Sequence, residues 1–276
     1  MNIVFDIGGT NMRIASAEGT ALGDVKKIPT PQDPKEAVAE FVRLAQEAAH
    51  GKTIRAVVGS IRWVVVDGVF LPGDKALPKW GGARLIEELS MALGAPVSFA
   101  HDTALIGLGE VHAGAGQGSR ICAYVTVSTG VGGDRIVDGS VDRSTYNPEI
   151  GNQIVNGEKL EDLISGTAVK KKFGIDPKNL ESLEERNKLA DILAIGLYNT
   201  VLHWSPDTIV LGGSMIVGVN PIPLARVESE LAKRLTMYPK APIVKMAQLG
   251  DVGGLIGAAI LAEEGLPAGQ AGLSPE

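Results

Sequence analysis

Two segments of the chain share one pattern, in which an apolar strand enters a turn of glycine and threonine and leaves through Arg-Ile. The first is Val4–Thr10, followed by Arg13-Ile14. The second is Ile121–Gly133, followed by Arg135-Ile136. An apolar strand that returns through a short glycine turn is typical of a β-hairpin. Two such hairpins in one chain indicate a duplication, which predicts two related domains.

Amphipathic helices alternate with apolar strands along the rest of the chain. Apolar residues at helical spacing and the cap-like pair Asp33-Pro34 predict a helix that Gly51 ends. This alternation favours α/β layers. The further helices expected are 83–93, 103–113, about 187–204 and 253–263, and the expected strands are 2–7, 12–17, part of 57–66, 96–100, 121–127, 208–211 and 243–247.

Composition excludes several classes of protein. Gly (35) and Pro (15) make up about 18% of the 276 residues, below the roughly 25–30% of low-complexity chains. The net charge of −6 argues against a protein whose main function is to bind nucleic acid. No apolar stretch approaches the ~18 residues needed to span a membrane, and the N-terminus lacks the basic start of a signal peptide. We therefore expect a soluble, cytoplasmic protein that binds neither nucleic acid nor membrane.

The cysteine content bounds the metal chemistry. Cys122 is the single cysteine and lies in an apolar run, which indicates a buried thiol in a reducing compartment. One cysteine and four histidines cannot form a cysteine-rich structural zinc site within one chain. We therefore expect no zinc site.

The glycine turns are candidate phosphate sites. A phosphate chain needs several backbone N–H groups that no Cβ obstructs, and a Thr or Ser hydroxyl adds a donor. Asp6 precedes the first turn, where a carboxylate can hold hydrated Mg²⁺ beside phosphate oxygens. The alternative is that both are simple hairpin turns without a ligand. A third glycine pair, Gly212-Gly213, also follows a strand and makes this alternative less favourable. The candidate residues are Asp6, Gly8, Gly9, Thr10, Asn11, Thr129, Gly130, Gly132, Gly133, Gly212 and Gly213.

Asp102 follows a buried strand and opens a helix. It has two interpretations: an N-terminal helix cap, or a general base that takes a proton from a substrate hydroxyl. Both can hold, because the helix dipole stabilises a carboxylate anion at a helix N-terminus. Further polar side chains suited to sugar hydroxyls are His101, Glu149, Asn152 and Glu161, each of which taken alone is more often structural.

In a series of segments the chain resembles the ROK family of bacterial sugar kinases. The segments occur in family order and span nearly the whole chain. The resemblance implies an α/β, two-domain actin/hexokinase-like (ribonuclease H-like) fold with an ATP cleft between the domains. The segments are Phe5–Arg13, His101–Ala104 with Gly109-Glu110, Val127–Gly133, Glu149–Gly151, Leu160-Glu161 with Ser165–Ala168, Ile209–Ser214 and Gly253–Ala259.

The resemblance also implies roles for the candidate residues. ATP, with Mg²⁺ placed by Asp6, would phosphorylate a hexose, typically on O6, with Asp102 as the base. The two glycine turns would hold the phosphates, Gly212 and Gly213 would lie against the nucleoside, and Glu149, Asn152 and Glu161 would line the sugar pocket. The expected domains are 1–109 plus a helix at 252–265, and 110–251, with a frayed tail at 266–276. The family also suggests a homodimer.

The chain departs from the family pattern beside both catalytic and sugar residues. His101 stands where the family usually has Asn, and Asn152 stands where it usually has His. The cysteine-rich zinc segment is absent. A glucose-like hexose is the first expectation. The alternatives are N-acetylhexosamine, mannose or fructose as substrate, polyphosphate as donor, and an inactive sugar-binding sensor; a regulator of the family type would carry a winged helix, whereas here the hairpin begins at Asn2.

Overall fold

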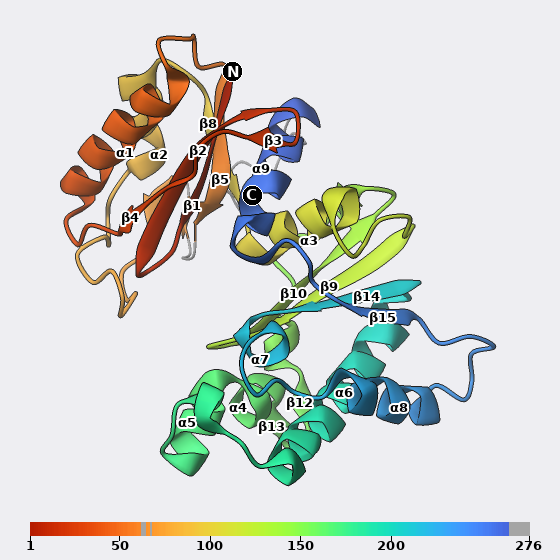
Figure 1. Ribbon diagram of the computed structural model, residues 1–276. Helices are drawn as coiled ribbons and strands as arrows, with labels where there is room; N and C mark the ends of the chain where they lie inside the picture. The colour runs from red at the N-terminus through yellow and green to blue at the C-terminus, as the bar shows by residue number, and fades with distance from the viewer. Residues whose placement is uncertain (62–64, 67, 265–276) are drawn as a thin grey trace. The chain divides into compact units, whose positions relative to one another are not determined.

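The computed structural model describes residues 1–61, 65–66 and 68–264, and its chain forms two units. The first unit comprises Met1–Gly109 and the chain from Asp251 onward, and the second comprises Glu110–Gly250 (Figure 1). The expected frayed tail, 266–276, lies outside the described residues. Among the described residues, no helix is both long and apolar enough to cross a membrane.

The first unit is built on a sheet with helices on both faces. The sheet strands are β1 (Asn2–Ile7), β2 (Asn11–Glu18), β3 (Ala21–Leu22), β4 (Lys26–Pro29), β5 (Ala56–Ile61) and β8 (Val97–Ala100), and a separate hairpin has β6 (Val65–Val66) and β7 (Val69–Phe70). The helices are α1 (Pro34–Ala49), α2 (Leu85–Leu93), α9 (Gly253–Glu264) and the start of α3 (Asp102–Ala113). Helices α1 and α2 cover one face of the sheet and α9 the other (Figure 1).

Local sequence accounts for the best-defined helix of this unit. The Asp33 carboxylate accepts hydrogen bonds from the N–H groups of Lys35 and Glu36, and Pro34 takes the first helical position. The buried face of α1 carries Phe41, whose ring packs edge-on against Phe5 of β1 with 5.2 Å between centroids. Burying one such aromatic side chain contributes about 1.5–3 kcal/mol, so this contact fixes α1 on the sheet.

The second unit repeats the sheet of the first. Its strands are β9 (Ile121–Val127), β10 (Val131–Val137), β11 (Ser140–Val141), β14 (Thr208–Gly212) and β15 (Ile243–Met246), with a small hairpin of β12 (Ile154–Val155) and β13 (Glu158–Lys159). The α-helices are α4 (Leu160–Ile164), α5 (Gly166–Phe173), α6 (Leu183–Trp204), α7 (Ser214–Val217) and α8 (Leu224–Arg234). Short 3₁₀ turns are η1 (Ile150–Asn152), η2 (Pro177–Asn179) and η3 (Gly250–Val252).

Five strands of each sheet share one topology, and the first sheet has β4 in addition, paired with β2. Their strand orders are β3-β2-β1-β5-β8 and β11-β10-β9-β14-β15. In each, an antiparallel hairpin is followed by two strands that run parallel to the hairpin's first strand. The duplication predicted from the two glycine turns is therefore present in the fold, and each turn joins the two strands of a hairpin.

Some elements differ from the sequence-based expectation. The long helix begins at Leu183, where the Ser182 hydroxyl accepts a bond from the N–H of Glu185, rather than at 187. Helix α8 was not among the expected helices, because Val227 and Leu231 are the apolar members of a buried face that also includes Glu230. Strand β4 was also not expected, because Lys26–Pro29 has two polar residues followed by two apolar ones, without the apolar–polar alternation of a strand.

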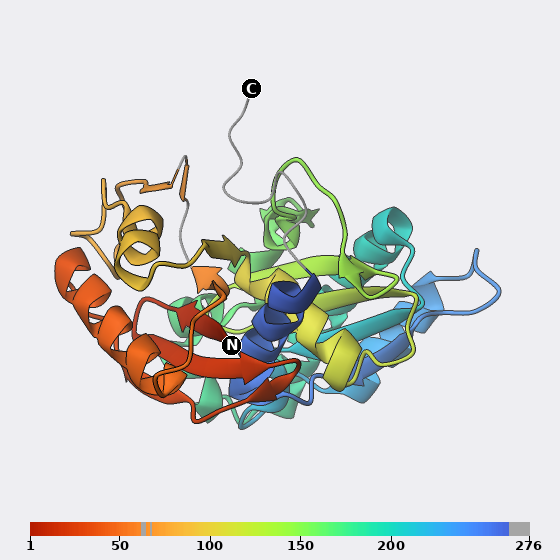
Figure 2. The same cartoon turned by 90° about the horizontal axis from the view of Figure 1, so that it is seen from above.

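Glycine allows α3 and α9 to pack closely within the first unit, and Figures 1 and 2 show the two helices side by side. A Cβ added to Gly257 of α9 would overlap the carbonyl oxygen of Leu105 in α3. A Cβ added to Gly109 would overlap the carbonyl oxygen of Gly253. The small residues of α9 therefore serve helix packing.

We predict opposite effects for two alanine substitutions in α9. Gly257→Ala should lower the free energy of unfolding by about 1–3 kcal/mol, the cost of overpacking against backbone that cannot yield. Gly254→Ala should be neutral or stabilising by up to about 1 kcal/mol through helix propensity, because its new Cβ meets only Ile106, at 3.6 Å. Urea denaturation of both variants measures the difference. Equal destabilisation by both substitutions would contradict the close approach of α3 and α9.

Cys122 is fully buried in β9, as its apolar run predicts. Burial raises the pKa of its thiol to about 12, so the reactive thiolate is nearly absent at neutral pH. We predict that a disulfide reagent such as DTNB does not titrate Cys122 at pH 8 in the folded protein. One thiol should react in guanidinium, which is the control. Rapid reaction of the folded protein would show that β9 is more open than described.

Candidate functional site

The first glycine turn, Gly8–Asn11, joins β1 to β2. The N–H of Gly8 donates to the Asn11 carbonyl at 2.9 Å and closes the turn. Behind it, Thr30 donates its hydroxyl to the Gly8 carbonyl at 2.7 Å and its N–H to the Thr10 carbonyl at 3.0 Å. Within the described residues, the N–H groups of Gly9 and Thr10 have no hydrogen-bond partner. The turn therefore offers two adjacent donors suited to a phosphate oxygen.

Asp6 is held by the strands on either side of β1. In the sheet register it lies opposite Arg13 of β2 and Ser60 of β5. Ser60 donates its hydroxyl to Oδ1 at 2.7 Å, and Arg13 donates to Oδ2 at 2.8 Å and also to Asp251 at 3.1 Å. Ser60 has no signal in the sequence that marks it as a partner of Asp6, because the two lie 54 residues apart.

The Asp6 carboxylate fits a hydrated Mg²⁺ ion. Each oxygen accepts one hydrogen bond from the protein and keeps a second lone pair for a water molecule. The side chain is 27% exposed, which leaves it accessible. Mg²⁺ usually keeps several of its waters and takes one or two carboxylates with substrate phosphates, so this donor set suits it.

Asp102 stands at the junction of β8 and α3. Its Oδ1 accepts the N–H of Thr103 at 2.8 Å, while Oδ2 has no hydrogen-bond partner among the described residues. The side chain is 47% exposed. Asp102 is the first residue of α3, and the Leu105 N–H donates to the His101 carbonyl, so the cap position falls on His101 rather than on Asp102. One Asp102 oxygen accepts the Thr103 N–H, and the other is available to accept a proton.

His101 is the sequence neighbour of Asp102 and lies against it. Its Nδ1 forms a hydrogen bond with the Thr103 hydroxyl at 2.7 Å, and its Nε2 lies 3.5 Å from Asp102 Oδ1. Of the residues expected at the sugar, His101 belongs to the first unit and the other three to the second.

The second glycine turn, Ser128–Gly130, joins β9 to β10. The Thr167 hydroxyl donates to the Thr129 carbonyl at 2.7 Å, the Thr167 N–H donates to the same carbonyl at 3.3 Å, and Gly166 donates to the Ser128 carbonyl at 2.7 Å. The N–H groups of Thr129 and Gly130 have no partner in the part of the chain that the structure describes. This turn thus repeats the donor arrangement of the first.

Glu161 connects the second turn to the expected sugar residues. Its Oε2 accepts the N–H of Val131 at 2.8 Å. A Cβ on Gly130 would lie 2.5 Å from the same oxygen, so glycine is required there for this contact. The turn of η1 also packs on Val131, because Gly151 lies against its carbonyl. Val131 therefore connects two segments that carry expected sugar residues: the turn of Glu149 and Asn152, and helix α4 with Glu161.

These three sugar candidates are exposed and polar. Asn152 donates its side-chain amide to Glu149 Oε2 at 3.2 Å, across the single turn of η1. Carboxylates and an amide side by side can both accept from and donate to vicinal hydroxyls. The arrangement therefore suits a polyol ligand.

The third glycine pair ends β14 at the same edge of the sheet as the second turn. Gly212 lies opposite Thr126 of the neighbouring parallel strand. Gly213 has a φ of 87°, which favours glycine, and a Cβ there would overlap the Val127 carbonyl. Among the candidate phosphate residues, Gly132 and Gly133 lie in β10 beyond the turn, and Gly133 packs against Ile150.

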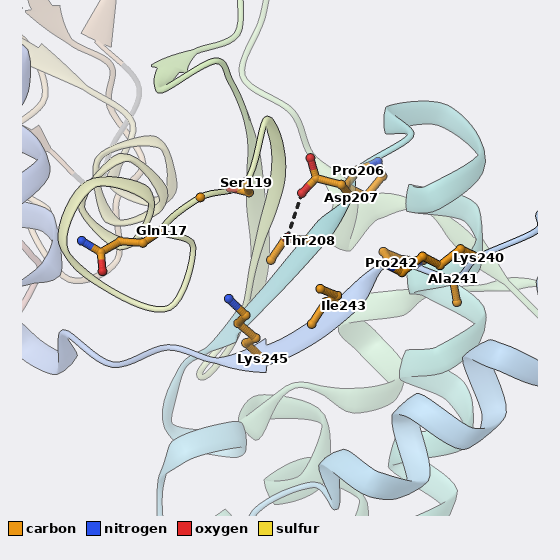
Figure 3. Close-up of a pocket in the computed structure, with 11 residues that line it drawn as sticks. Gln117, Ser119, Pro206, Asp207, Thr208, Lys240, Ala241, Pro242, Ile243 and Lys245 are labelled. Carbon is orange, nitrogen blue, oxygen red and sulfur yellow. Dashed lines mark hydrogen bonds between the residues drawn. The ribbon is translucent and has the colours of Figure 1, made fainter.

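A hollow of about 350 Å³ opens at the other end of β14, beside Thr208 and Ile243 (Figure 3). None of the predicted site residues lines it, and two of its charged side chains are already engaged. Lys245 donates to the Ala115 carbonyl at 2.9 Å, and Asp207 accepts the Thr208 hydroxyl at 2.8 Å. Burial acts to raise the pKa of Asp207, but hydrogen bonds from the Ile121 N–H and Thr208 outweigh it and lower that pKa. This hollow therefore does not supply the predicted site.

Comparison with known proteins identifies the family. Residues 2–265 match the sequence model of the ROK family. The chain belongs to this family.

Relatives of the chain include sugar kinases. A fructokinase of Zymomonas mobilis is 31% identical over 68% of this chain and 73% of its own length. The ROK hexokinase of Thermus thermophilus superposes with a TM-score of 0.81 at 25% identity, covering 96% of this chain and 99% of that one. A ROK family glucokinase of Streptomyces griseus, in complex with glucose and AMPPNP, has a TM-score of 0.74 at 23% identity, covering 96% and 99%. The α/β, actin/hexokinase fold predicted from the sequence is confirmed.

We predict that a zinc-selective chelator leaves the melting temperature and ligand binding of the purified chain unchanged. Among the described residues, no group of three or more His, Cys, Asp or Glu side chains could hold a metal ion. Asn152 stands where the resemblance leads one to expect His, and an amide is not among the usual ligands of structural zinc. Loss of structure under the chelator, with restoration by added zinc, would contradict the prediction.

Proposed function

We propose that this protein transfers the γ-phosphoryl group of ATP to a hexose, at O6, with Asp102 as the general base. The observation that carries the proposal is the geometry of Asp102. Its Oδ1 is engaged by the Thr103 N–H, its Oδ2 is open, and half of the side chain is accessible at the start of α3. A carboxylate held in this way can accept a proton from a substrate hydroxyl.

The phosphate chain of ATP would bind the free N–H groups of both glycine turns, those of Gly9 and Thr10 and those of Thr129 and Gly130. Gly212 and Gly213 would lie against the nucleoside. Bound Mg²⁺, held through water by Asp6, would neutralise phosphate charge. Phosphoryl transfer depends mainly on positioning and charge stabilisation, which oriented backbone N–H groups supply.

The proposed transfer moves one proton, forms one bond to phosphorus and breaks another. Asp102 Oδ2 takes the proton of the sugar O6 hydroxyl as that oxygen attacks the γ-phosphorus. The new O6–phosphorus bond forms while the bond from the γ-phosphorus to the β,γ-bridging oxygen breaks, and ADP leaves with that electron pair. The protonated Asp102 then releases its proton to solvent as the sugar phosphate departs.

The sugar would be held by Glu149, Asn152 and Glu161, with His101 beside the reacting hydroxyl. A glucose-like hexose suits this set of acceptors and donors. Fructose, mannose and N-acetylhexosamine are the alternative substrates, and polyphosphate is the alternative donor. A panel of these sugars and both donors, measured by ADP release and by sugar phosphate formed, ranks them.

We predict that Asp102→Asn lowers kcat by at least about 10²-fold, the scale of a lost general base. The amide preserves the size of the side chain and can still accept the Thr103 N–H, so the fold and nucleotide binding should persist. A coupled ADP-release assay measures kcat, and calorimetry with a non-hydrolysable ATP analogue is the control. An Asn variant as active as the wild type would overturn the role of Asp102.

We predict that Gly130→Ala raises the KM for the sugar about tenfold while the fold remains intact. The new Cβ would displace the Glu161 carboxylate, a flexible side-chain end, and break its bond to Val131. The displaced carboxylate would no longer bond the sugar, and the loss of a hydrogen bond to a charged group costs about 1.5–3 kcal/mol of binding free energy, which corresponds to tenfold or more. Gly254→Ala in α9 is the matched control. An unchanged sugar KM would contradict the placement of Glu161 in the sugar site.

A further inference from the structure

The two glycine turns share a feature that their sequences do not show, which is a threonine bonded to them from behind. Thr30 follows β4 in the first unit, and Thr167 lies at the start of α5 in the second. Each threonine donates both its hydroxyl and its N–H to carbonyl oxygens of its turn. We call Thr30 and Thr167 the clamping threonines.

In the first unit the clamp engages the carbonyls on both sides of Gly9. Thr30 is 5% exposed and donates to Gly8 at 2.7 Å and to Thr10 at 3.0 Å. The Asn11 carbonyl is occupied by the N–H of Gly8. Three carbonyls of this turn are thus engaged, while the N–H groups of Gly9 and Thr10 stay without a partner among the described residues.

In the second unit the clamp arises from a different element. Thr167 donates to the Thr129 carbonyl through its hydroxyl at 2.7 Å and through its N–H at 3.3 Å, and its neighbour Gly166 donates to Ser128 at 2.7 Å. The Gly130 carbonyl accepts the N–H of Ser128 at 2.8 Å. A loop residue and a helix start therefore produce a similar result among the described residues: the N–H groups have no partner, and the carbonyls are engaged except that of Gly9.

This separation of donors from acceptors has an electrostatic consequence. A peptide carbonyl carries partial negative charge and repels a phosphate oxygen, whereas a peptide N–H attracts it. A turn whose carbonyls are fixed by the protein keeps its N–H groups oriented before the ligand arrives, which lowers the ordering cost of binding. We propose that Thr30 and Thr167 are positioning residues that preorganise the two phosphate-binding turns. The proposal rests on the proposed function, since it acts on the same turns.

The test replaces each clamping threonine by valine, which keeps the shape and removes the hydroxyl. Thr30→Val and Thr167→Val should each raise the Kd for a non-hydrolysable ATP analogue, and the KM for ATP, at least about fivefold. In the first variant the Gly8 carbonyl loses its donor, and in the second the Thr129 carbonyl keeps only the longer bond from the Thr167 N–H. The sugar KM should stay within about twofold. Thr30→Ser and Thr167→Ser, which keep the hydroxyl, should restore binding to within about twofold of the wild type.

Thr200→Val is the matched control. Thr200 is buried in α6 and donates its hydroxyl to the Gly196 carbonyl of the same helix at 3.0 Å. Its substitution should shift the melting temperature and leave the Kd for the ATP analogue unchanged. If the clamp variants behave as this control does, with lower melting temperature and unchanged nucleotide binding, the threonines are merely structural and the proposal is overturned.

The outcomes separate this proposal from the proposed function. Calorimetry with the ATP analogue and with inorganic tripolyphosphate measures the turns without any turnover. A wild type that binds either probe but phosphorylates no sugar would refute the kinase, while the valine variants would still test the clamps. A wild type that binds neither probe would overturn both. If Thr30→Val fails to fold, the exposed Thr167 carries the test, and unchanged binding in Thr167→Val overturns the proposal.

Discussion

The proposed binding of phosphate rests on four backbone N–H groups, at Gly9, Thr10, Thr129 and Gly130, that have no hydrogen-bond partner among the described residues. A buried N–H would normally have to be paired, and these four stay free because they sit in turns that connect the strands of hairpins. The hairpins are held in turn by the parallel strands beside them. Each copy of the sheet thus presents one pair of N–H donors in the turn of its hairpin.

The sequence predicted the fold and the turns because these depend on local rules. The residues that begin α1, Asp33 as its N-cap and Pro34 at the first helical position, are neighbours in sequence. Helix α2 likewise ends at an adjacent residue, Gly94. Each glycine turn directly follows an apolar strand, and this pattern occurs twice in the chain. The family model matches residues 2–265, in agreement with the resembling segments, which span nearly the whole chain.

The contacts that organise the candidate site could not be predicted, because they join residues far apart in sequence. Ser60 reaches Asp6 only through the pairing of β1 with β5, and Thr30 reaches Gly8 only through the pairing of β4 with β2. Likewise, the bond of Glu161 to Val131 follows from the docking of α4 on the second turn. No spacing in the sequence predicts that Ser60, Thr30 and Glu161 form these bonds.

Phosphorus NMR of the purified chain with ATP, Mg²⁺ and glucose tests the central claim most directly, with the hexose panel examined in the same way. The proposed chemistry predicts ADP resonances together with a phosphomonoester resonance that couples to the two protons on C6 of the sugar. An ATP spectrum unchanged with every hexose, or inorganic phosphate as the product in place of a sugar phosphate, would contradict it.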